Sequence, residues 1–157
     1  MHVNEQLIHS FYTAFQRKDF EAMNACYANT ATFFDPVFLD LTAPQVRGMW
    51  EMFCKNGKEL NIDFKILSYD EYSGEAEWIA SYLFSATGRK VTNRITAHFT
   101  FENSLIVHHS DSFSFYKWSR QALGATGLLL GWTSFLQNKV RANAMQSLAR
   151  FIAKKSS

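Results

Sequence analysis

The chain has 157 residues, of which 47% are hydrophobic and 16% aromatic, and this length suffices for one domain with a full core. The net charge is only +2, and the basic residues are not interleaved with exposed aromatics, so nucleic-acid binding is not expected. Residues 1–111 carry nine Lys/Arg and fourteen Asp/Glu, whereas residues 112–157 carry seven Lys/Arg and no acid. We expect a domain over residues 1–117 and a basic helical extension over 118–157 that is integral to the same domain.

Apolar residues recur at helical spacing in the first third of the chain. Residues 3–15 form one such stripe, and Asp19 is placed to cap a short second helix that continues to Tyr27. The segment Thr42-x-x-Gln45 is a capping-box signature, so a third helix is predicted to begin there and to end at Gly57.

The period changes to two from residue 61 onward. Turn signals at 72–74, 87–90 and 103–104 divide this region into four strands, the last of which is expected to reach about Tyr116. Helices followed by hairpins predict an α+β fold, with the helices packed on one face of a curved antiparallel sheet. A second capping-box pattern, Ser134-x-x-Gln137, predicts a C-terminal helix.

The cysteines and the apolar segments predict the cellular compartment. Cys26 and Cys54 fall at apolar positions of predicted helices without a CxxC motif, so we expect buried free thiols in a reducing cytoplasm. The N-terminal residues lack a signal-peptide pattern, and the longest apolar run, 122–132, is short and interrupted by glycines. We therefore expect a cytoplasmic protein that does not span a membrane, with membrane contact considered only for the basic tail.

Asp35-Pro36-Val37 places a carboxylate on a rigid turn next to aromatic residues at 33, 34 and 38. A carboxylate among aromatic rings is costly to ionise, so we expect its pKa to rise toward values useful for proton transfer. The alternative is an ordinary turn Asp that accepts hydrogen bonds from nearby backbone N–H groups.

Three motifs in chain order resemble the NTF2-like superfamily, in particular its SnoaL-like and steroid Δ5-isomerase branches. They are Tyr27-Ala28-Asn29-x-Ala31-x-x-x-Asp35-Pro36-Val37, Gly88-Arg89-Lys90 and His98-Phe99-x-Phe101. The resemblance covers roughly residues 3–116 and implies a cone in which helices close over a curved sheet and enclose one apolar pocket. It also implies a homodimer through the outer sheet face, and it makes Asp35 the base that moves a proton between carbons. The tail resembles an extension found in some bacterial SnoaL-like proteins.

The chain departs from the isomerase pattern at both oxyanion donors. By the resemblance, Phe11 and Ala97 occupy the positions of a donor Tyr and a protonated Asp. Each missing donor typically costs on the order of 10²–10³-fold in rate. A steroid isomerase would therefore need Tyr12, Tyr82 or His109 as a substitute.

The last strand supplies two further candidates, His109 and Asp111. If its hairpin pairs Phe101 with Leu105, both side chains point into the cone, with His109 opposite Ala97. SnoaL-type polyketide cyclases are similar in using an Asp from a late strand as acid or base. A shift of one residue would turn Asp111 outward, where it could pair with Arg94 or Lys90, and His109 could be a hydrogen-bonded core residue.

The predicted catalytic residues are thus Asp35, His109 and Asp111. His98 and His108 are expected to be cross-strand neighbours on the outer face, where two histidines make a poor metal site, so neither metal nor cofactor is predicted. The residues expected to contact substrate are aromatic or small and lie on the predicted inner surfaces: Tyr12, Phe15, Tyr27, Trp78, Tyr82, Phe84, Ala97, Phe99 and Phe113.

Three functions remain open from the sequence. The first is an enzyme that moves protons on a small apolar substrate, as an isomerase, cyclase, dehydratase or epoxide hydrolase. The second is a binding protein or dimeric scaffold that holds a similar molecule without catalysis. In the third, the helix over residues 134–157, which has basic residues beside its apolar stripe, docks on a membrane or on a partner. The alternative for this helix is that it packs on the domain and leaves its basic face in solvent.

Overall fold

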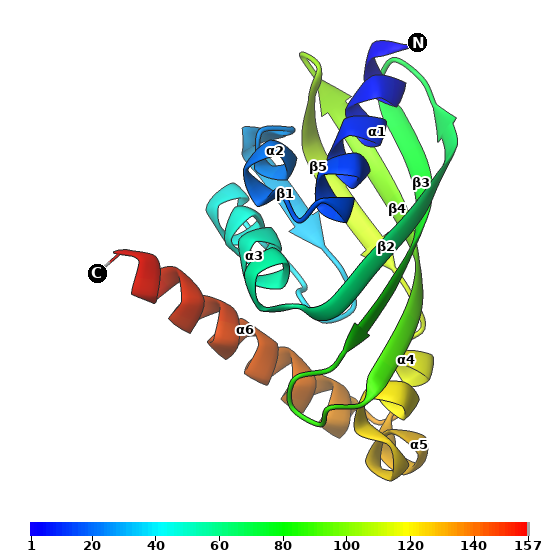
Figure 1. Ribbon diagram of the computed structural model, residues 1–157, viewed down its shortest axis with the longest axis vertical. Coiled ribbons are helices and arrows are strands. Elements are labelled where there is room, and N and C mark those ends of the chain that lie inside the picture. The colour runs from blue at the N-terminus through cyan, green and yellow to red at the C-terminus, as the bar shows by residue number, and fades with distance from the viewer. Residues whose placement is uncertain (157) are drawn as a thin grey trace.

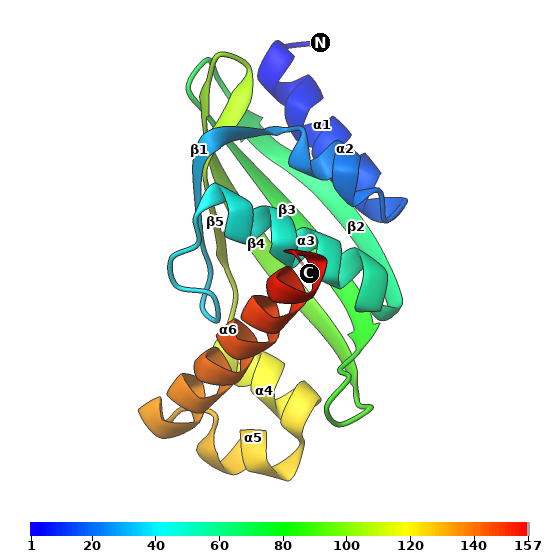
Figure 2. The same ribbon diagram turned by 90° about the vertical axis from the view of Figure 1, so that its left-hand side faces the viewer.

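The computed structural model describes residues 1–156 and confirms the α+β fold (Figures 1 and 2). Three N-terminal helices lie on one face of a curved five-stranded sheet, and three more helices follow the sheet. The helices are α1 (Val3–Gln16), α2 (Phe20–Asn24), α3 (Ala43–Asn56), α4 (Phe115–Leu123), α5 (Ala125–Leu130) and α6 (Ser134–Ser156). The strands are β1 (Tyr27–Phe34), β2 (Lys58–Tyr69), β3 (Ser73–Leu83), β4 (Lys90–Glu102) and β5 (Leu105–Ser112).

Strand β1 corrects the expectation that the second helix continues to Tyr27. The sheet order is β1-β5-β4-β3-β2, with β1 parallel to β5 and the other pairs antiparallel. Helix α2 ends at Asn24, and the chain then alternates, with Ala31 and Phe33 buried and Thr32 and Phe34 exposed. These β-branched and aromatic residues suit the free edge that β5 offers, a long-range partner that helical spacing cannot reveal.

The pairing of β4 with β5 differs by two residues from the expected register. Asp111 lies opposite Ala97 and His109 opposite Phe99, and a bulge follows Thr100. Because side chains alternate with a period of two, a shift of two residues keeps His109 and Asp111 on the inner face. Strand β5 also ends at Ser112 and not near Tyr116, since the hydroxyl of Ser114 caps α4.

Side-chain caps define the ends of several helices. Asp19 caps α2, and Thr42 with Gln45 forms the predicted capping box of α3. The cap of α6 is Thr133 and not Ser134, because the hydroxyl of Thr133 accepts a hydrogen bond from the Leu136 N–H at 3.3 Å. A short hydroxyl before the first turn satisfies a free backbone donor, and Thr133 is the residue whose hydroxyl reaches it.

Helix α6 lies across α3, as Figure 2 shows. Leu148 is buried there, and a Cβ on Gly48 of α3 would come within 2.8 Å of the Ile152 side chain, so glycine allows the close approach. Glu51 is 4% exposed and forms ion pairs with Lys55 of its own helix and Lys155 of α6. The extension is thereby fixed to the N-terminal helices.

The two cysteines, Cys26 and Cys54, are buried and free, as the sequence predicts. Within the described part of the chain, no helix combines the length and the apolar character needed to cross a membrane.

Candidate functional site

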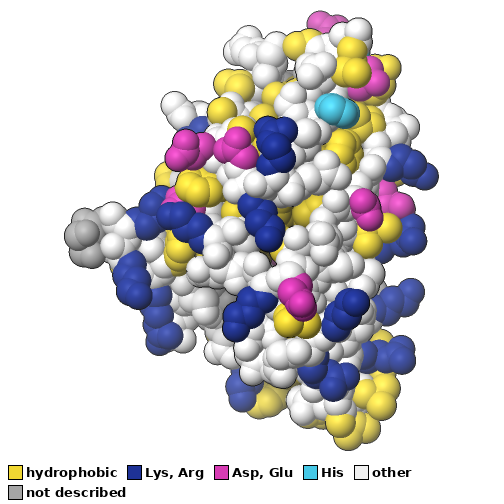
Figure 3. All heavy atoms as spheres, in the orientation of Figure 1, with side chains coloured by type: hydrophobic (Ala, Val, Ile, Leu, Met, Phe, Trp, Pro, Cys, Tyr) yellow, Lys and Arg dark blue, Asp and Glu magenta, His cyan; other side chains and the backbone are white. Residues whose placement is uncertain are grey.

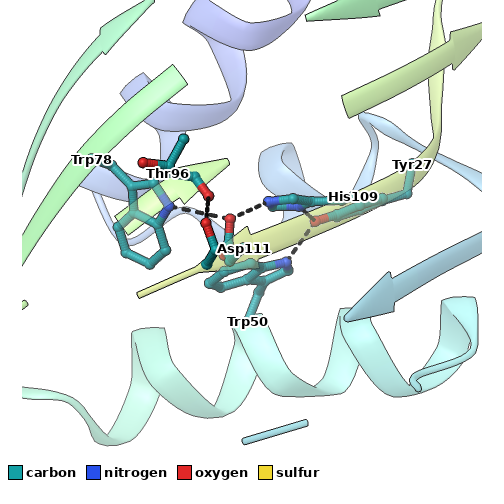
Figure 4. Close-up of polar contacts among 7 residues, drawn as sticks. Tyr27, Trp50, Trp78, Thr96, His109 and Asp111 are labelled. Carbon is teal, nitrogen blue, oxygen red and sulfur yellow. Dashed lines mark hydrogen bonds and ion pairs between the residues drawn. The ribbon is translucent and has the colours of Figure 1, made fainter. Parts of the chain in front are cut away.

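A chain of hydrogen bonds runs through the buried centre between α3 and the sheet (Figure 4). His109 and Asp111 of β5 are joined by a contact of 2.8 Å between Nε2 and Oδ1. The other ring nitrogen of His109 lies 2.8 Å from the hydroxyl of Tyr27, which accepts a hydrogen bond from the indole of Trp50 at 2.9 Å. The indole of Trp78 donates to Asp111 at 3.4 Å.

One set of proton positions satisfies every group in this network. An indole N–H only donates, so the Tyr27 oxygen accepts from Trp50 and directs its own proton to Nδ1 of His109. Nδ1 is then an acceptor, and the proton of a neutral His109 lies on Nε2 and is donated to Asp111. The hydrogen bonds thus run in one direction, from Trp50 through Tyr27 and His109, and the Asp111 carboxylate is the final acceptor.

Aromatic rings fill the space around His109. The nearest ring centroids are those of Phe99 at 4.3 Å, Phe33 at 5.0 Å and Phe11 at 5.8 Å, and His109 itself is 0% exposed. The space around His109 is therefore filled by side chains, and the apolar pocket expected from the resemblance is not open there. The network lies in a medium of low dielectric constant, where an unpaired polar group would be costly.

Asp35 lies on the turn after β1 and is partly buried. Its Oδ1 accepts hydrogen bonds from the backbone N–H groups of Val37 at 2.7 Å and Phe38 at 2.6 Å. Burial raises the pKa of Asp35 to about 7, opposed by the two backbone hydrogen bonds and supported by the negative charge of Asp111. Asp35 is thus both a turn residue that caps backbone donors and an acid with a raised pKa.

The turn of Asp35 adjoins a boundary between two hydrophobic clusters. The main core fills the cone, and a smaller cluster joins β3 and β4 to the C-terminal extension. Val37, Tyr82 and Phe113 pack against both clusters, and Phe84 and Trp118 belong to the smaller one. We call these five side chains the seam.

Asp35 and Tyr82 are close enough to influence each other electrostatically. The pKa of Tyr82 is raised chiefly by burial and further by the charge of Asp35. The Tyr82 hydroxyl accepts a hydrogen bond from the Trp118 indole at 2.8 Å. The seam therefore combines apolar walls, one acid and one phenol.

The extension closes the seam from outside. The Nε of Arg141 in α6 donates to the backbone carbonyl of Pro36 at 2.9 Å, and Val140 packs against the smaller cluster. A hollow of about 210 Å³ is lined by Tyr82 together with other residues of β2 and β3 and the start of β4. Tyr82 is thus the seam residue that borders this hollow.

Sequence comparison supports the family that the residues suggest. The model of the SnoaL-like domain matches residues 8–109, which is more than half of the chain. The chain belongs to the SnoaL-like domain family. No curated protein shows significant sequence similarity to this SnoaL-like chain.

Solved structures share the fold at low sequence identity. A proposed polyketide cyclase from Silicibacter sp. TM1040 has a TM-score of 0.67 at 15% identity, covering 76% of this chain and 94% of that one. An LEH-like epoxide hydrolase of M. tuberculosis has a TM-score of 0.61 at 16% identity, covering 85% and 95%. TerC, crystallised with polyporic acid, has a TM-score of 0.66 at 10% identity, covering 76% and 98%. These likenesses establish the NTF2-like fold of the SnoaL-like chain.

The predicted site residues fall into two groups in this SnoaL-like domain. His109 and Asp111 contact each other, whereas the hydrogen bonds of Asp35 go to its own turn and to neither of them. Six predicted binding residues are buried around the network: Tyr12, Phe15, Tyr27, Trp78, Ala97 and Phe99. The other three belong to the seam: Tyr82, Phe84 and Phe113.

Several pairings left open by the sequence are settled by the contacts. Arg94 pairs with Glu77 on the outer face, so Asp111 is not its partner. His98 and His108 are both exposed, but they are not direct cross-strand neighbours, since Ser110 lies opposite the first and Thr100 opposite the second. The two-residue change in register accounts for this difference.

Sequence reasoning misses the roles of two tryptophans. Trp50 falls on the apolar stripe of α3 and therefore looks like a core residue, although its indole also donates to Tyr27. Trp118 is the first residue of the predicted extension and lies in α4, a helix whose bounds the sequence does not predict, from which it donates to Tyr82. The only signal in the sequence is that a buried indole N–H needs an acceptor, and this does not identify the acceptor.

Tyr12 carries a buried hydroxyl that has no hydrogen-bond partner among the described residues. Its ring stacks on Phe64, with centroids 5.3 Å apart, and its pKa is raised by burial and then by the charge of Asp111. A buried hydroxyl without a partner is a free donor inside the domain. It is adjacent in sequence to Phe11, the position where the isomerases have their donor tyrosine.

Replacing Tyr12 with Phe should leave stability unchanged or raise the free energy of unfolding by about 1 kcal/mol. The change removes only the unpaired hydroxyl and keeps the stacked ring. Urea unfolding of the wild type and the variant measures this difference. A loss of more than about 1 kcal/mol would show that the hydroxyl has a structural partner.

Proposed function

We propose that the protein binds a small apolar molecule at the seam and that Asp35 moves a proton on it. The observation that carries the proposal is the raised pKa of Asp35, about 7, on a turn that adjoins apolar and aromatic walls. A base works best when its pKa lies near the operating pH, because it is then both ionised and basic enough to accept a proton.

The comparisons support the class of ligand. TerC was crystallised with polyporic acid, and other neighbours are described as a polyketide cyclase and an epoxide hydrolase. We propose isomerase, cyclase, dehydratase or epoxide hydrolase chemistry for this chain, with Asp35 as base. In this proposal the ligand contacts the side chains of the seam.

We assign His109 and Asp111 a positioning role in this reaction. Both nitrogens of His109 are engaged and its side chain is 0% exposed, so a substrate at the seam meets Asp35 first. The charge of Asp111 contributes to the raised pKa of Asp35. Tyr82 is the donor we propose for developing negative charge, because it belongs to the seam, lies near Asp35, and its oxygen accepts from Trp118 while its own proton can be donated.

Turnover of a panel of apolar β,γ-unsaturated ketones and epoxides between pH 5 and 9 tests the proposal. We expect kcat/KM to rise with pH through a midpoint near 7 and to level off above about pH 8, because the ionised form of Asp35 is the base. Asp35→Asn should lower kcat/KM by at least about 10²-fold. The exposed Asp40, changed to Asn, is the matched control and should leave turnover unchanged. Equal turnover by wild type and Asp35→Asn would refute the role of Asp35.

A non-catalytic binding protein is the second candidate. It is favoured by Phe11 and Ala97, which are fully buried and supply no hydrogen-bond donor from their side chains. In this case Nile red, an uncharged apolar probe, should bind to the wild type and to Asp35→Asn with similar affinity, and neither protein should turn over the panel.

The assembly and compartment are also proposals. We propose a homodimer through the outer sheet face, where alternation in β4 exposes Arg94, His98 and Thr100. We propose a reducing, cytoplasmic location because both thiols are free and buried. Light scattering of the purified protein gives the mass of the assembly, and a monomer over the working concentration range would rule out the dimer.

A further inference from the structure

The end of the molecule formed by α5 and the start of α6 exposes an unusual amount of apolar surface. We call this set the apolar tip. Five large side chains in eight residues are between 43% and 74% exposed: Leu128, Leu129, Leu130, Trp132 and Phe135. Figure 3 shows hydrophobic side chains gathered at the lower end of the molecule, where Figure 1 places α5.

Two glycines force these side chains outward. Gly127 and Gly131 are four residues apart, so they share one face of the turn, and both are buried against α4. A Cβ at Gly127 would lie 1.9 Å from the Ser119 carbonyl oxygen, and one at Gly131 would lie 2.2 Å from the Ser119 hydroxyl oxygen. The glycine face must therefore be the inner one, and the three leucines between them have no core to enter.

The apolar tip is held rigidly and is not a frayed segment. The Tyr116 hydroxyl donates to the Leu128 carbonyl at 2.9 Å, and the Trp132 indole donates to the Leu129 carbonyl at 3.1 Å. The Thr133 hydroxyl donates to the Leu130 carbonyl at 2.6 Å and caps the next helix. Exposing so much apolar surface to water is unfavourable. An exposed apolar surface that is nevertheless fixed in shape is typical of an interaction site.

Basic side chains border the apolar tip. Arg89, Lys90, Lys117 and Arg120 line an open hollow of about 720 Å³ that also includes Leu128. Residues 112–157 contain no Asp or Glu, so nothing in the extension itself neutralises these charges. The guanidinium of Arg89 is held by the Gln121 carbonyl at 2.8 Å, which keeps its positive charge at the hollow.

We propose that the apolar tip and its basic border dock this protein on an anionic lipid bilayer surface. The leucines and Trp132 would enter the boundary between headgroups and acyl chains, while Lys117 and Arg120 face the lipid phosphates. Apolar burial and attraction to anionic lipid add together in such interfacial contacts. The inference is independent of the chemistry proposed for Asp35. From the sequence, membrane contact is considered only for the apolar stripe of residues 134–157. That stripe packs on α3 through Leu148, so the apolar tip offers a different surface.

Vesicle co-sedimentation of the full chain tests the docking. We expect at least about 10-fold tighter partitioning to POPC:POPG (70:30) vesicles than to POPC vesicles, and a loss of preference for POPG when 0.5 M NaCl is added. The variant Leu129→Ser/Trp132→Ser/Phe135→Ser should lose at least about 10-fold in partitioning. The double variant Lys117→Gln/Arg120→Gln should bind POPC:POPG vesicles as weakly as it binds POPC vesicles.

Exposed apolar residues at the other end of the molecule provide a matched control. Leu67 and Tyr72, in and just after β2, are 44% and 68% exposed, and Figure 1 places this hairpin opposite α5. The variant Leu67→Ser/Tyr72→Ser should partition like the wild type. Equal loss in this control would show that exposed apolar area alone, and not the apolar tip, drives sedimentation, and would overturn the proposal.

Tryptophan fluorescence gives a direct readout of the apolar tip. Three of the four tryptophans are at most 6% exposed, whereas Trp132 is 72% exposed, so a shift in emission on adding vesicles reports on Trp132. We expect a blue shift with POPC:POPG vesicles that is absent in Trp132→Phe, which keeps an apolar ring.

Two results would overturn the inference. One is an unchanged emission spectrum together with equal sedimentation of the wild type and the triple variant. The other is a concentration-dependent dimer that the triple variant abolishes, seen by light scattering without any vesicle binding, because the apolar tip would then be a contact with a second copy.

Discussion

Replacing His109 with Leu should lower the free energy of unfolding by about 3–5 kcal/mol. The substitution keeps a buried apolar volume but removes the group that links Tyr27 to Asp111. Among the described residues, the Asp111 carboxylate then retains only the longer side-chain hydrogen bond from Trp78. A buried carboxylate that loses its main partner cannot regain water, and this accounts for most of the cost. Urea unfolding monitored by circular dichroism measures the change.

The adjacent His108 is the matched control for this experiment. It lies on the outer face of the same strand, exposed, with a hydrogen bond to Thr32. His108→Leu should change stability by no more than about 0.5 kcal/mol. Adding Asp111→Ala to His109→Leu should cost less than the sum of the two single changes, since the pair is removed together. Additive costs would mean that His109 and Asp111 do not stabilise each other.

Asp35→Asn should make the protein more stable than the wild type at pH 8 and about equally stable at pH 4. The pKa of Asp35 is about 7 in the folded protein and near its ordinary value of 3.8 when unfolded, so the folded state holds the proton more tightly. Stability that depends on this proton is present below pH 4 and is lost as pH rises toward 7. The folded and unfolded pKa values of Asp35 differ by about three units, which limits the gain in unfolding free energy to about 4 kcal/mol. Because Asp35 is partly exposed, we expect a gain of about 2–4 kcal/mol.

The difference between the unfolding free energies of Asp35→Asn and wild type, measured from pH 4 to 9, isolates this group because other titrations cancel. Asparagine is the right replacement because its side-chain oxygen can still accept from the Val37 and Phe38 N–H groups. Asp40→Asn should give a small difference that does not vary with pH. A flat curve for Asp35→Asn would mean that the carboxylate is already solvated in the folded state.

The sequence predicts most of the fold because the local signals agree with one another. The capping residues Asp19 and Thr42 and the Asn103–Ser104 turn act within a few residues, and each is found where its pattern predicts. Strand β1 was missed because its partner, β5, lies about 75 residues away along the chain. Because the pairing partner is so distant, the local spacing of apolar residues does not distinguish this strand from the end of a helix.

The site was less predictable than the fold, for reasons that concern single contacts. Alternation placed His109 and Asp111 inside, and an error of two residues in register did not change that result. Alternation could not show that the hydroxyl of Tyr27, which accepts from the Trp50 indole, occupies the second nitrogen of His109. The apolar tip was also not predictable, since runs of leucine are normally buried and only the packing of Gly127 and Gly131 on Ser119 turns them outward.

The most direct test is a ¹³C NMR titration of the Asp35 carboxyl carbon, assigned by its disappearance in Asp35→Asn. Removal from water near apolar walls and near Asp111 predicts a midpoint at about pH 7. A midpoint near pH 4 would contradict the account, because an ordinary surface carboxylate would then occupy the position to which proton transfer has been assigned.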